Sequence, residues 1–289
     1  MTNSFLSRIL PGPIALMLAL LCGASSLHLP AAEKPLRILL VTGGCCHDYA
    51  KQKDALKKGL EARAHLLVDQ VHTDDKSTRP PLAILGHPGY AEGYDLVIHD
   101  ECASDISDPE TIQGVLKPHQ NGIPAVTLHC AMHSFRIGNP NTPVEPGAPR
   151  GGWFEFLGLQ SSGHGPQKPI EIAFVDQDHP AVKGLEGWTT IDEELYNNVQ
   201  IFKGTRVLAR GKQTVPGRDG AGRVTDFAVV WTNEYGANKT RVFSTTLGHN
   251  SATVEDARYL DLVVRGVLWA TGHLNDDGSP AKGYGPGGK

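Results

Sequence analysis

A short apolar run that ends in histidine and cysteine residues is the part of the chain best suited to chemistry. Residues 125–129 are typical of a buried β-strand, and Cys130 and His133 follow its last residue, His129. In open α/β sheets, ligands bind beyond the carboxyl ends of the strands. We therefore predict that these polar side chains face a functional site rather than the core.

Two more histidines and a carboxylate are expected at the same edge. His47 lies in the loop after the first predicted strand, His249 just beyond a late strand, and Glu194 in a segment between strands. Zinc and similar ions take neutral imidazole and carboxylate ligands and keep a position open for water or substrate. We predict His47, His129 and His249 as ligands of a divalent metal ion, with zinc favoured, and His129 and Glu194 as acid–base groups. Loop capping is the alternative for each histidine taken singly.

The strands and helices that must position these residues are indicated by apolar runs that alternate with amphipathic patterns along the chain. They predict an α/β fold with a doubly wound, mostly parallel sheet in three layers, over one domain at residues 35–272. The proline-rich and glycine-rich residues 138–152 are typical of a surface loop or lid near the site, and residues 273–289 of a flexible tail. The expected strands are 37–42, 66–68, 95–99, 125–129, 170–175, 205–209, 227–231 and 241–246, and the expected helices are 49–62, 109–119 and about 253–270.

Charge and hydropathy narrow the class of ligand. The net charge is -4 and the pI is near 6.3, without a basic stripe, so nucleic-acid binding is not expected. No run after the first 32 residues approaches the roughly 20 apolar residues of a membrane span, so stable membrane insertion is not expected either. A small neutral or anionic molecule is the favoured partner, and the sequence leaves a homo-oligomer open.

Residues 1–32 differ in composition from the rest of the chain. Arg8 precedes the apolar run 14–21, and small residues follow, which is typical of a secretory signal peptide. We therefore expect a periplasmic or secreted protein. Cys22 follows the large Leu21, which argues against lipid attachment at that cysteine.

The cysteines beyond this leader are too few for a disulfide framework in a domain of this size. They are Cys45, Cys46, Cys102 and Cys130. We do not expect the adjacent Cys45 and Cys46 to bridge each other.

Several short motifs occur along the chain in a particular order and spacing. They are Gly43-Gly44 with His47-Asp48, Leu128-His129, Gly163-His164, Asp-His-Pro-Ala-Val-Lys-Gly-Leu at 178–185, Glu-Glu-Leu-Tyr at 193–196, Val-Trp-Thr at 230–232 and Arg-Val-Phe-Ser-Thr-Thr-Leu-Gly-His-Asn at 241–250. Together they resemble the ThuA-like, or trehalose-utilisation, family over roughly residues 35–272. The resemblance implies the fold of class I glutamine amidotransferases and a link to disaccharide catabolism through 3-keto sugars.

Other residues would complete a sugar site. We expect His164 to close over it as a further catalytic residue and Asp100 to bind a sugar hydroxyl, while Trp153 and Tyr196 offer aromatic faces for a sugar ring. A solvated loop histidine and a turn-forming carboxylate are the plain alternatives. Residues 43–46 lack the Gly-x-Gly-x-x-Gly spacing of a dinucleotide loop, so no nicotinamide cofactor is predicted.

Cys130 occupies the position of an amidotransferase nucleophile. However, the elbow Leu-His-Cys-Ala-Met lacks the flanking glycines that favour so sharp a turn. No late His-x-Glu pair is present to activate a thiolate, because His249 is followed by Asn250. A buried packing thiol is the favoured interpretation.

Three functions from different classes follow. The first is an enzyme that acts on a 3-keto sugar or glycoside through the histidines and Glu194. The second is a cysteine-dependent amidase or hydrolase that uses Cys130. The third is a non-catalytic carbohydrate-binding accessory protein.

Overall fold

The computed structural model describes residues 33–216 and 222–289, together with the first two residues of the chain. The predicted signal peptide, including Cys22, lies outside these residues apart from its first two. Within the described part of the chain, no helix is long and apolar enough to cross a membrane.

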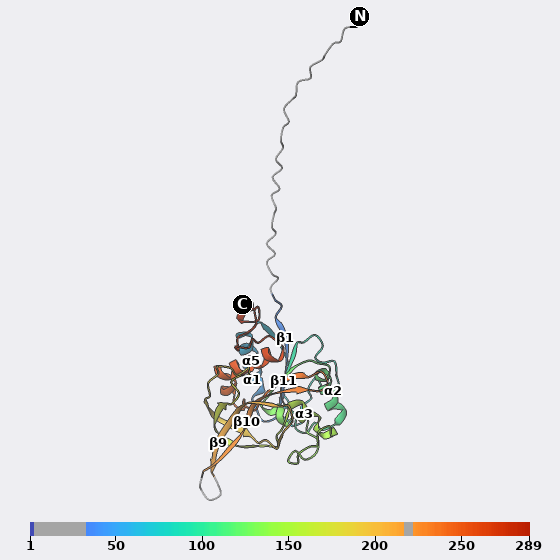
Figure 1. Cartoon of the computed structure of the whole chain (residues 1–289). Coiled ribbons are helices and arrows are strands. Elements are labelled where there is room, and N and C mark those ends of the chain that lie inside the picture. The colour runs from blue at the N-terminus through green and yellow to red at the C-terminus, as the bar shows by residue number, and fades with distance from the viewer. Residues whose placement is uncertain (3–32, 217–221) are drawn as a thin grey trace. The chain divides into compact units, whose positions relative to one another are not determined.

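A nine-stranded sheet in the order β2-β1-β3-β4-β11-β10-β9-β6-β7 forms the centre of the domain (Figure 1). Strands β2, β1, β3, β4 and β11 are parallel to one another, and the remaining strands add on as antiparallel neighbours. The bounds are β1 Leu36–Gly44, β2 Leu66–Thr73, β3 Leu96–Cys102, β4 Ala125–Leu128, β6 His164–Phe174, β7 Thr189–Tyr196, β9 Arg206–Pro216, β10 Gly222–Tyr235 and β11 Thr240–Thr245, with a separate pair β5 Leu159–Gln160 and β8 Gln200–Ile201.

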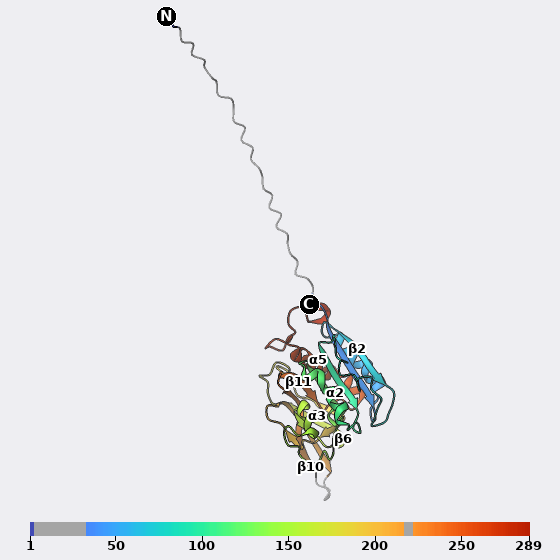
Figure 2. The same ribbon diagram turned by 90° about the vertical axis from the view of Figure 1, so that its right-hand side faces the viewer.

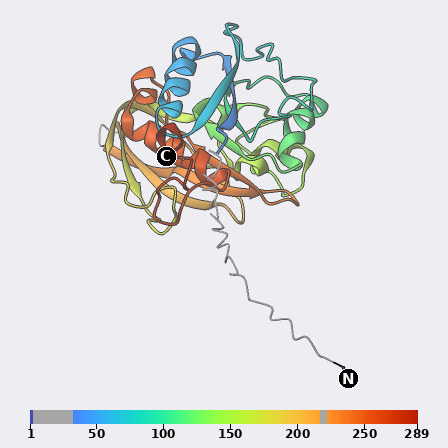
Figure 3. The same ribbon diagram turned by 90° about the horizontal axis from the view of Figure 1, so that it is seen from above.

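Helices cover both faces of the parallel part of the sheet (Figure 3). On one face, Leu56 of α1 and Val263 of α5 pack in the same core as Ile38 of β1; on the other, Val115 of α2 shares a core with Leu39. Both faces of a doubly covered strand must be apolar, which explains the unbroken apolar run of β1. The helices are α1 Tyr49–Glu61, α2 Pro109–Gln120, α3 Gly152–Leu157, α4 Ser251–Val254 and α5 Ala257–Ala270, with 3-10 turns η1 His129–His133, η2 Pro149–Gly151 and η3 Pro286–Gly288.

Local sequence signals set the start of the longer helices. The Asp108 carboxylate accepts a hydrogen bond from the Thr111 backbone N–H at 2.8 Å, and Pro109 occupies the first turn of α2. Asp48 caps α1 in the same way. The predicted doubly wound α/β fold is confirmed, and α1 and α2 begin where they were expected. The single helix expected at about 253–270 is instead two, α4 and α5, because Asp256 caps a new helix start.

The antiparallel half differs from the expectation. β9 and β10 extend well beyond their apolar runs (Figure 1), and β7 forms where no strand was expected. These segments carry many polar residues, so only a short part of each has the apolar pattern of a strand. The hydrogen bonds between the strands nevertheless continue beyond that part. Figure 2 shows β2 on one side of the domain, far from β6 and β10.

The loop at 138–152 and the C-terminal segment make specific contacts with the rest of the domain. The loop at 138–152 is fixed by Gln160, whose side-chain amide donates to the Pro140 and Thr142 carbonyls at 2.7 and 3.0 Å. In the C-terminal segment, the Tyr284 carbonyl accepts a hydrogen bond from the His65 backbone N–H at 3.0 Å. Backbone hydrogen bonds thus join this polar, glycine-rich segment to the domain, and its flexibility stays a prediction.

Candidate functional site

Three histidines meet at the carboxyl edge of the parallel strands. His47 lies in the loop after β1, His129 begins η1 after β4, and His249 lies between β11 and α4. One ring nitrogen from each lies within 4.8 Å of those of the other two. The topology brings these residues together as predicted, because β1, β4 and β11 belong to the same parallel group.

We call His47, His129 and His249 the edge cluster. Glu194 lies between two of its members, His129 and His249. Its Oε1 lies 3.2 Å from His249 Nδ1, and its Oε2 lies 3.5 Å from the Nε2 atoms of His129 and His164. Burial would raise the pKa of Glu194, but the contacts with His129 and His249 outweigh it and hold that pKa well below its usual range. Glu194 is thus a buried carboxylate on β7, not a residue of a segment between strands.

His129 has a fixed ring orientation and an unusual backbone. Its Nδ1 donates a hydrogen bond to the Thr246 carbonyl at 2.6 Å, so Nε2 faces the Tyr196 hydroxyl and the Glu194 carboxylate. Its φ of 40° is in the left-handed region, so the chain turns sharply at the end of β4. This elbow forms at His129 although no glycine flanks it.

Two ring nitrogens of the edge cluster are buried without a hydrogen-bond partner. They are His47 Nδ1 and His249 Nδ1; the latter lies at ion-pair distance from Glu194 but without hydrogen-bond geometry. Burial, followed by the proximity of His129 and His249, lowers the pKa of His47 to about 3, so its ring is neutral. The contact with Glu194 raises the pKa of His249. Unpaired imidazole nitrogens beside a carboxylate fit the donor set of a zinc-like ion.

Buried polar residues that sequence reasoning missed hold the His249 loop. Glu193 accepts hydrogen bonds from the backbone N–H groups of His249 and Asn250 at 3.0 and 3.1 Å. Gln52 of α1 donates to the carbonyls of Gly248 and His249. Gly248 has a φ of 120°, and a Cβ there would lie 2.9 Å from the Tyr259 hydroxyl, so the loop requires glycine. The Glu-Glu pair at 193–194 was the only signal for the role of Glu193.

Tyr196 belongs to the site through its hydroxyl rather than its ring face. The hydroxyl lies 3.3 Å from His129 Nε2 and can donate to it, while the ring stacks on His133 with centroids 4.2 Å apart. Only 1% of Tyr196 is exposed, so its face is not free for a sugar ring. His164, at the start of β6, is the partly exposed member of the site and lies beside Glu194.

Two predicted substrate contacts lie away from an open surface. Trp153 is 2% exposed, donates its indole N–H to the Ala131 carbonyl at 2.9 Å and packs against Phe135, so it is a core residue. Asp100 lies inside β3 and is also buried. Burial, and then the neighbouring Glu101, raise the pKa of Asp100 well above its usual range. The strand β3 continues past the expected end of its apolar run, which is why Asp100 does not reach solvent.

The cysteines form two disulfides, contrary to the expectation from their number. Cys45 pairs with its neighbour Cys46, and Cys102 pairs with Cys130. A left-handed φ of 82° at Cys46 accompanies the adjacent pairing. Cys130 is buried and bonded, so in this state it offers no thiolate for nucleophilic catalysis.

A second group of histidines lies inside the domain. His99 and His119 are fully buried, with their Nε2 atoms 3.0 Å apart. His99 Nδ1 lies 2.8 Å from Glu101 Oε1, and His119 Nδ1 lies 2.7 Å from the Ile123 carbonyl oxygen. We call His99 and His119 the interior pair.

The fold and the edge cluster define an α/β protein with a buried His/Glu site at the carboxyl edge of a doubly wound sheet. The model of the ThuA family, described as trehalose utilisation, matches residues 37–270. The chain belongs to this family. A search of curated proteins found no match.

Two solved structures of putative ThuA-like proteins share the fold. A putative ThuA-like protein from Parabacteroides merdae is 24% identical, with a TM-score of 0.58 over 82% of this chain and 90% of that one. A putative ThuA-like protein from Bacteroides uniformis is 18% identical, with a TM-score of 0.54 over 84% of this chain and 95% of that one. A putative GMP synthase subunit from Thermoplasma acidophilum is more distant, at 8% identity and a TM-score of 0.41 over 80% of this chain and 94% of that one.

Proposed function

We propose that this ThuA-family protein acts on a 3-keto sugar or glycoside, with His129 and Glu194 as its acid–base groups. The observation that carries the proposal is the Glu194 carboxylate, held 3.2 to 3.5 Å from ring nitrogens of His129, His164 and His249. Such a site can move a proton between positions a few ångströms apart. Its family relates the protein to trehalose utilisation. The predicted signal peptide supports a periplasmic or secreted location.

The residues of the site have complementary roles. His129 keeps a lone pair on Nε2 because its Nδ1 proton is engaged by Thr246. Nε2 can therefore accept the proton on the carbon next to the substrate ketone, and the adjacent Glu194 carboxylate stabilises the imidazolium that forms. The Tyr196 hydroxyl, 3.3 Å from the same nitrogen, orients it. This proton transfer suits isomerisation, elimination or hydration of a keto sugar.

The donor set of the edge cluster also supports a divalent metal ion, held by His47, His129 and His249. A bound ion would polarise a substrate ketone or hydroxyl and so acidify the neighbouring proton. If Nε2 of His129 binds the ion, it cannot accept a proton as well, and Glu194 would accept the proton from the substrate carbon instead. The two arrangements use the same residues, and metal analysis separates them.

The test is to incubate the protein with 3-keto-trehalose or another 3-keto glucoside and to follow products by NMR. We expect turnover in the wild type and a loss of about 1,000-fold or more in His129→Ala and Glu194→Gln. The matched control is His87→Ala, because His87 is an exposed loop histidine. Binding without turnover in the wild type would favour a carbohydrate-binding accessory protein, and the absence of both would contradict the proposal.

A further inference from the structure

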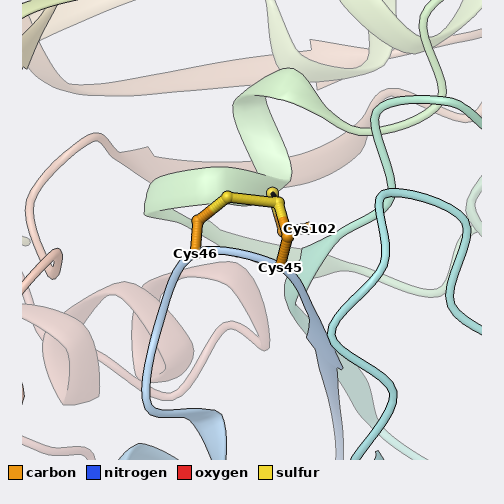
Figure 4. A group of neighbouring side chains, drawn as sticks. All are labelled: Cys45, Cys46 and Cys102. Carbon is orange, nitrogen blue, oxygen red and sulfur yellow. Dashed lines mark hydrogen bonds between the residues drawn. A yellow bond between two sulfur atoms is a disulfide. The ribbon is translucent and has the colours of Figure 1, made fainter.

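The four cysteines of the described residues gather at one point beside the candidate site. The sulfur atoms of Cys45, Cys46 and Cys102 lie within 4.8 Å of one another (Figure 4). Cys130 joins them through its disulfide to Cys102. They come from the ends of β1 and β3 and from η1, which are neighbours at the carboxyl edge of the sheet.

The two disulfides are in contact, and they differ in exposure. The Sγ atoms of Cys45 and Cys102 are 3.4 Å apart. Cys46 is exposed and Cys45 is half-buried, whereas Cys102 and Cys130 are 3% and 4% exposed. A molecule in solution can therefore reach the first disulfide directly, whereas the second is buried against it.

The close approach of the two strand ends depends on the residue before the cysteines. Gly44 has a φ of 102°, and a Cβ at this position would lie 2.1 Å from the Cys102 carbonyl oxygen. Any side chain here would push β1 away from β3. The glycine thus allows Cys45 to lie against Cys102.

The geometry points to a thiol–disulfide relay, in which an external dithiol reduces the buried Cys102–Cys130 disulfide through the exposed Cys45–Cys46 disulfide. The partner is a small-molecule or protein dithiol that meets Cys46 at the surface. This activity is separate from the sugar chemistry proposed above and does not depend on it.

The exchange has three steps, each of which makes one S–S bond and breaks one. The external dithiol first reduces Cys45–Cys46 and leaves as a disulfide. The Cys45 thiolate then attacks Cys102 Sγ, forms a Cys45–Cys102 bond and releases the Cys130 thiolate. The Cys46 thiolate attacks Cys45 Sγ, restores Cys45–Cys46 and releases the Cys102 thiolate. Two electrons and two protons pass from the dithiol to Cys102 and Cys130.

The test follows the reduction of Cys102–Cys130 with time. Oxidised protein is mixed with dilute dithiothreitol under native conditions, quenched with an alkylating agent and mapped by mass spectrometry. We expect Cys102 and Cys130 to be labelled about tenfold more slowly, or slower still, in Cys45→Ser/Cys46→Ser than in the wild type. Circular dichroism and thermal melting show whether the double variant is folded.

The single variant Cys46→Ser gives a second readout that does not depend on rates. It keeps the attacking Cys45 but removes the thiol that would resolve the intermediate. We therefore expect a trapped Cys45–Cys102 disulfide together with a free Cys130. Equal reduction rates in the wild type and a folded double variant, or an intact Cys102–Cys130 bond with a free Cys45 in Cys46→Ser, would overturn the relay. So would four free thiols holding a metal in protein purified without reductant.

Discussion

The protein has two histidine clusters on the same sheet, and they differ in how their ring nitrogens are satisfied. In the interior pair, Glu101, the other histidine and the Ile123 carbonyl provide partners for the nitrogens of His99 and His119. In the edge cluster, Nδ1 of His47 is buried without a hydrogen bond, and Nδ1 of His249 has only the Glu194 carboxylate at ion-pair distance. Buried polar atoms without partners are rare because each costs free energy. Unmet hydrogen bonding, rather than burial, therefore marks the edge cluster as a site for a ligand.

Metal binding should give the largest difference between the two clusters. A ligand at 1,000 times its Kd stabilises a folded protein by about 4 kcal/mol, so saturating zinc should raise the melting temperature by several degrees. We expect this shift to disappear in His249→Ala and to persist in a folded His119 variant. Calorimetry of apo-protein, prepared with EDTA and then given zinc, measures both. Unchanged melting, with no metal in protein purified without chelator, would leave the edge cluster a protonic role only.

Truncation within each cluster should have unequal effects on stability. His119→Ala removes a buried side chain, opens a cavity and leaves Nε2 of His99 without a partner, so we expect a loss of about 3 kcal/mol in the free energy of unfolding. His47→Ala should cost about 1 kcal/mol or less in metal-free protein, because it removes a buried polar atom that has no hydrogen bond. Urea denaturation of the two variants gives the comparison. A larger cost for His47→Ala would mean that its ring is already satisfied.

The acid sensitivity of the interior pair gives a smaller effect. Burial, and then His99, lower the pKa of His119 to about 3. As the pH falls from about 6.5 toward 3, the unfolded chain takes up a proton at His119 and the folded protein does not. Stability is therefore lost over this window, by up to about 1.4 kcal/mol per pH unit for this group.

The contribution of His119 to the pH dependence of stability can be separated from that of the other histidines with one variant. His119→Gln is uncharged at every pH, so its stability should fall less steeply than that of the wild type between pH 6 and pH 5. Its lower absolute stability does not affect this slope. Parallel slopes in urea denaturation at the two pH values would show that His119 is protonated in the folded state.

The parallel half of the fold could be predicted from local patterns, and the rest depended on pairings between distant segments. β1 and α2 carry continuous apolar runs, caps and a helix-starting proline, and these signals lie within a few residues. Glu194 reaches the site because β7 pairs with β6, and no local pattern reports that pairing. The chain order did place His47, His129 and His249 at one edge, because parallel strands end together.

The sequence could not show which candidates have their polar groups satisfied. Trp153 was expected at the site by motif order, but its indole N–H is used by the Ala131 carbonyl inside the core. His119 is buried at the end of α2 beside Tyr90, whose hydroxyl lies 3.3 Å from His119 Nε2. The disulfides depend on three strand ends meeting. Each of these outcomes is a property of tertiary contacts rather than of spacing.

The smallest expected effect tests whether Tyr196 serves the edge cluster through its hydroxyl or through its ring. Tyr196→Phe keeps the ring that stacks on His133 and removes only the hydroxyl 3.3 Å from His129 Nε2. Because one hydrogen bond is lost, we expect about 1 kcal/mol or less of destabilisation and a roughly tenfold lower kcat on the keto sugar, with KM nearly unchanged. A sugar-stacking ring would behave differently, since phenylalanine would preserve both parameters and Tyr196→Leu would raise KM. Steady-state kinetics of the two variants therefore decides the role: an unchanged kcat in Tyr196→Phe would contradict the hydroxyl contact with His129 as a functional one.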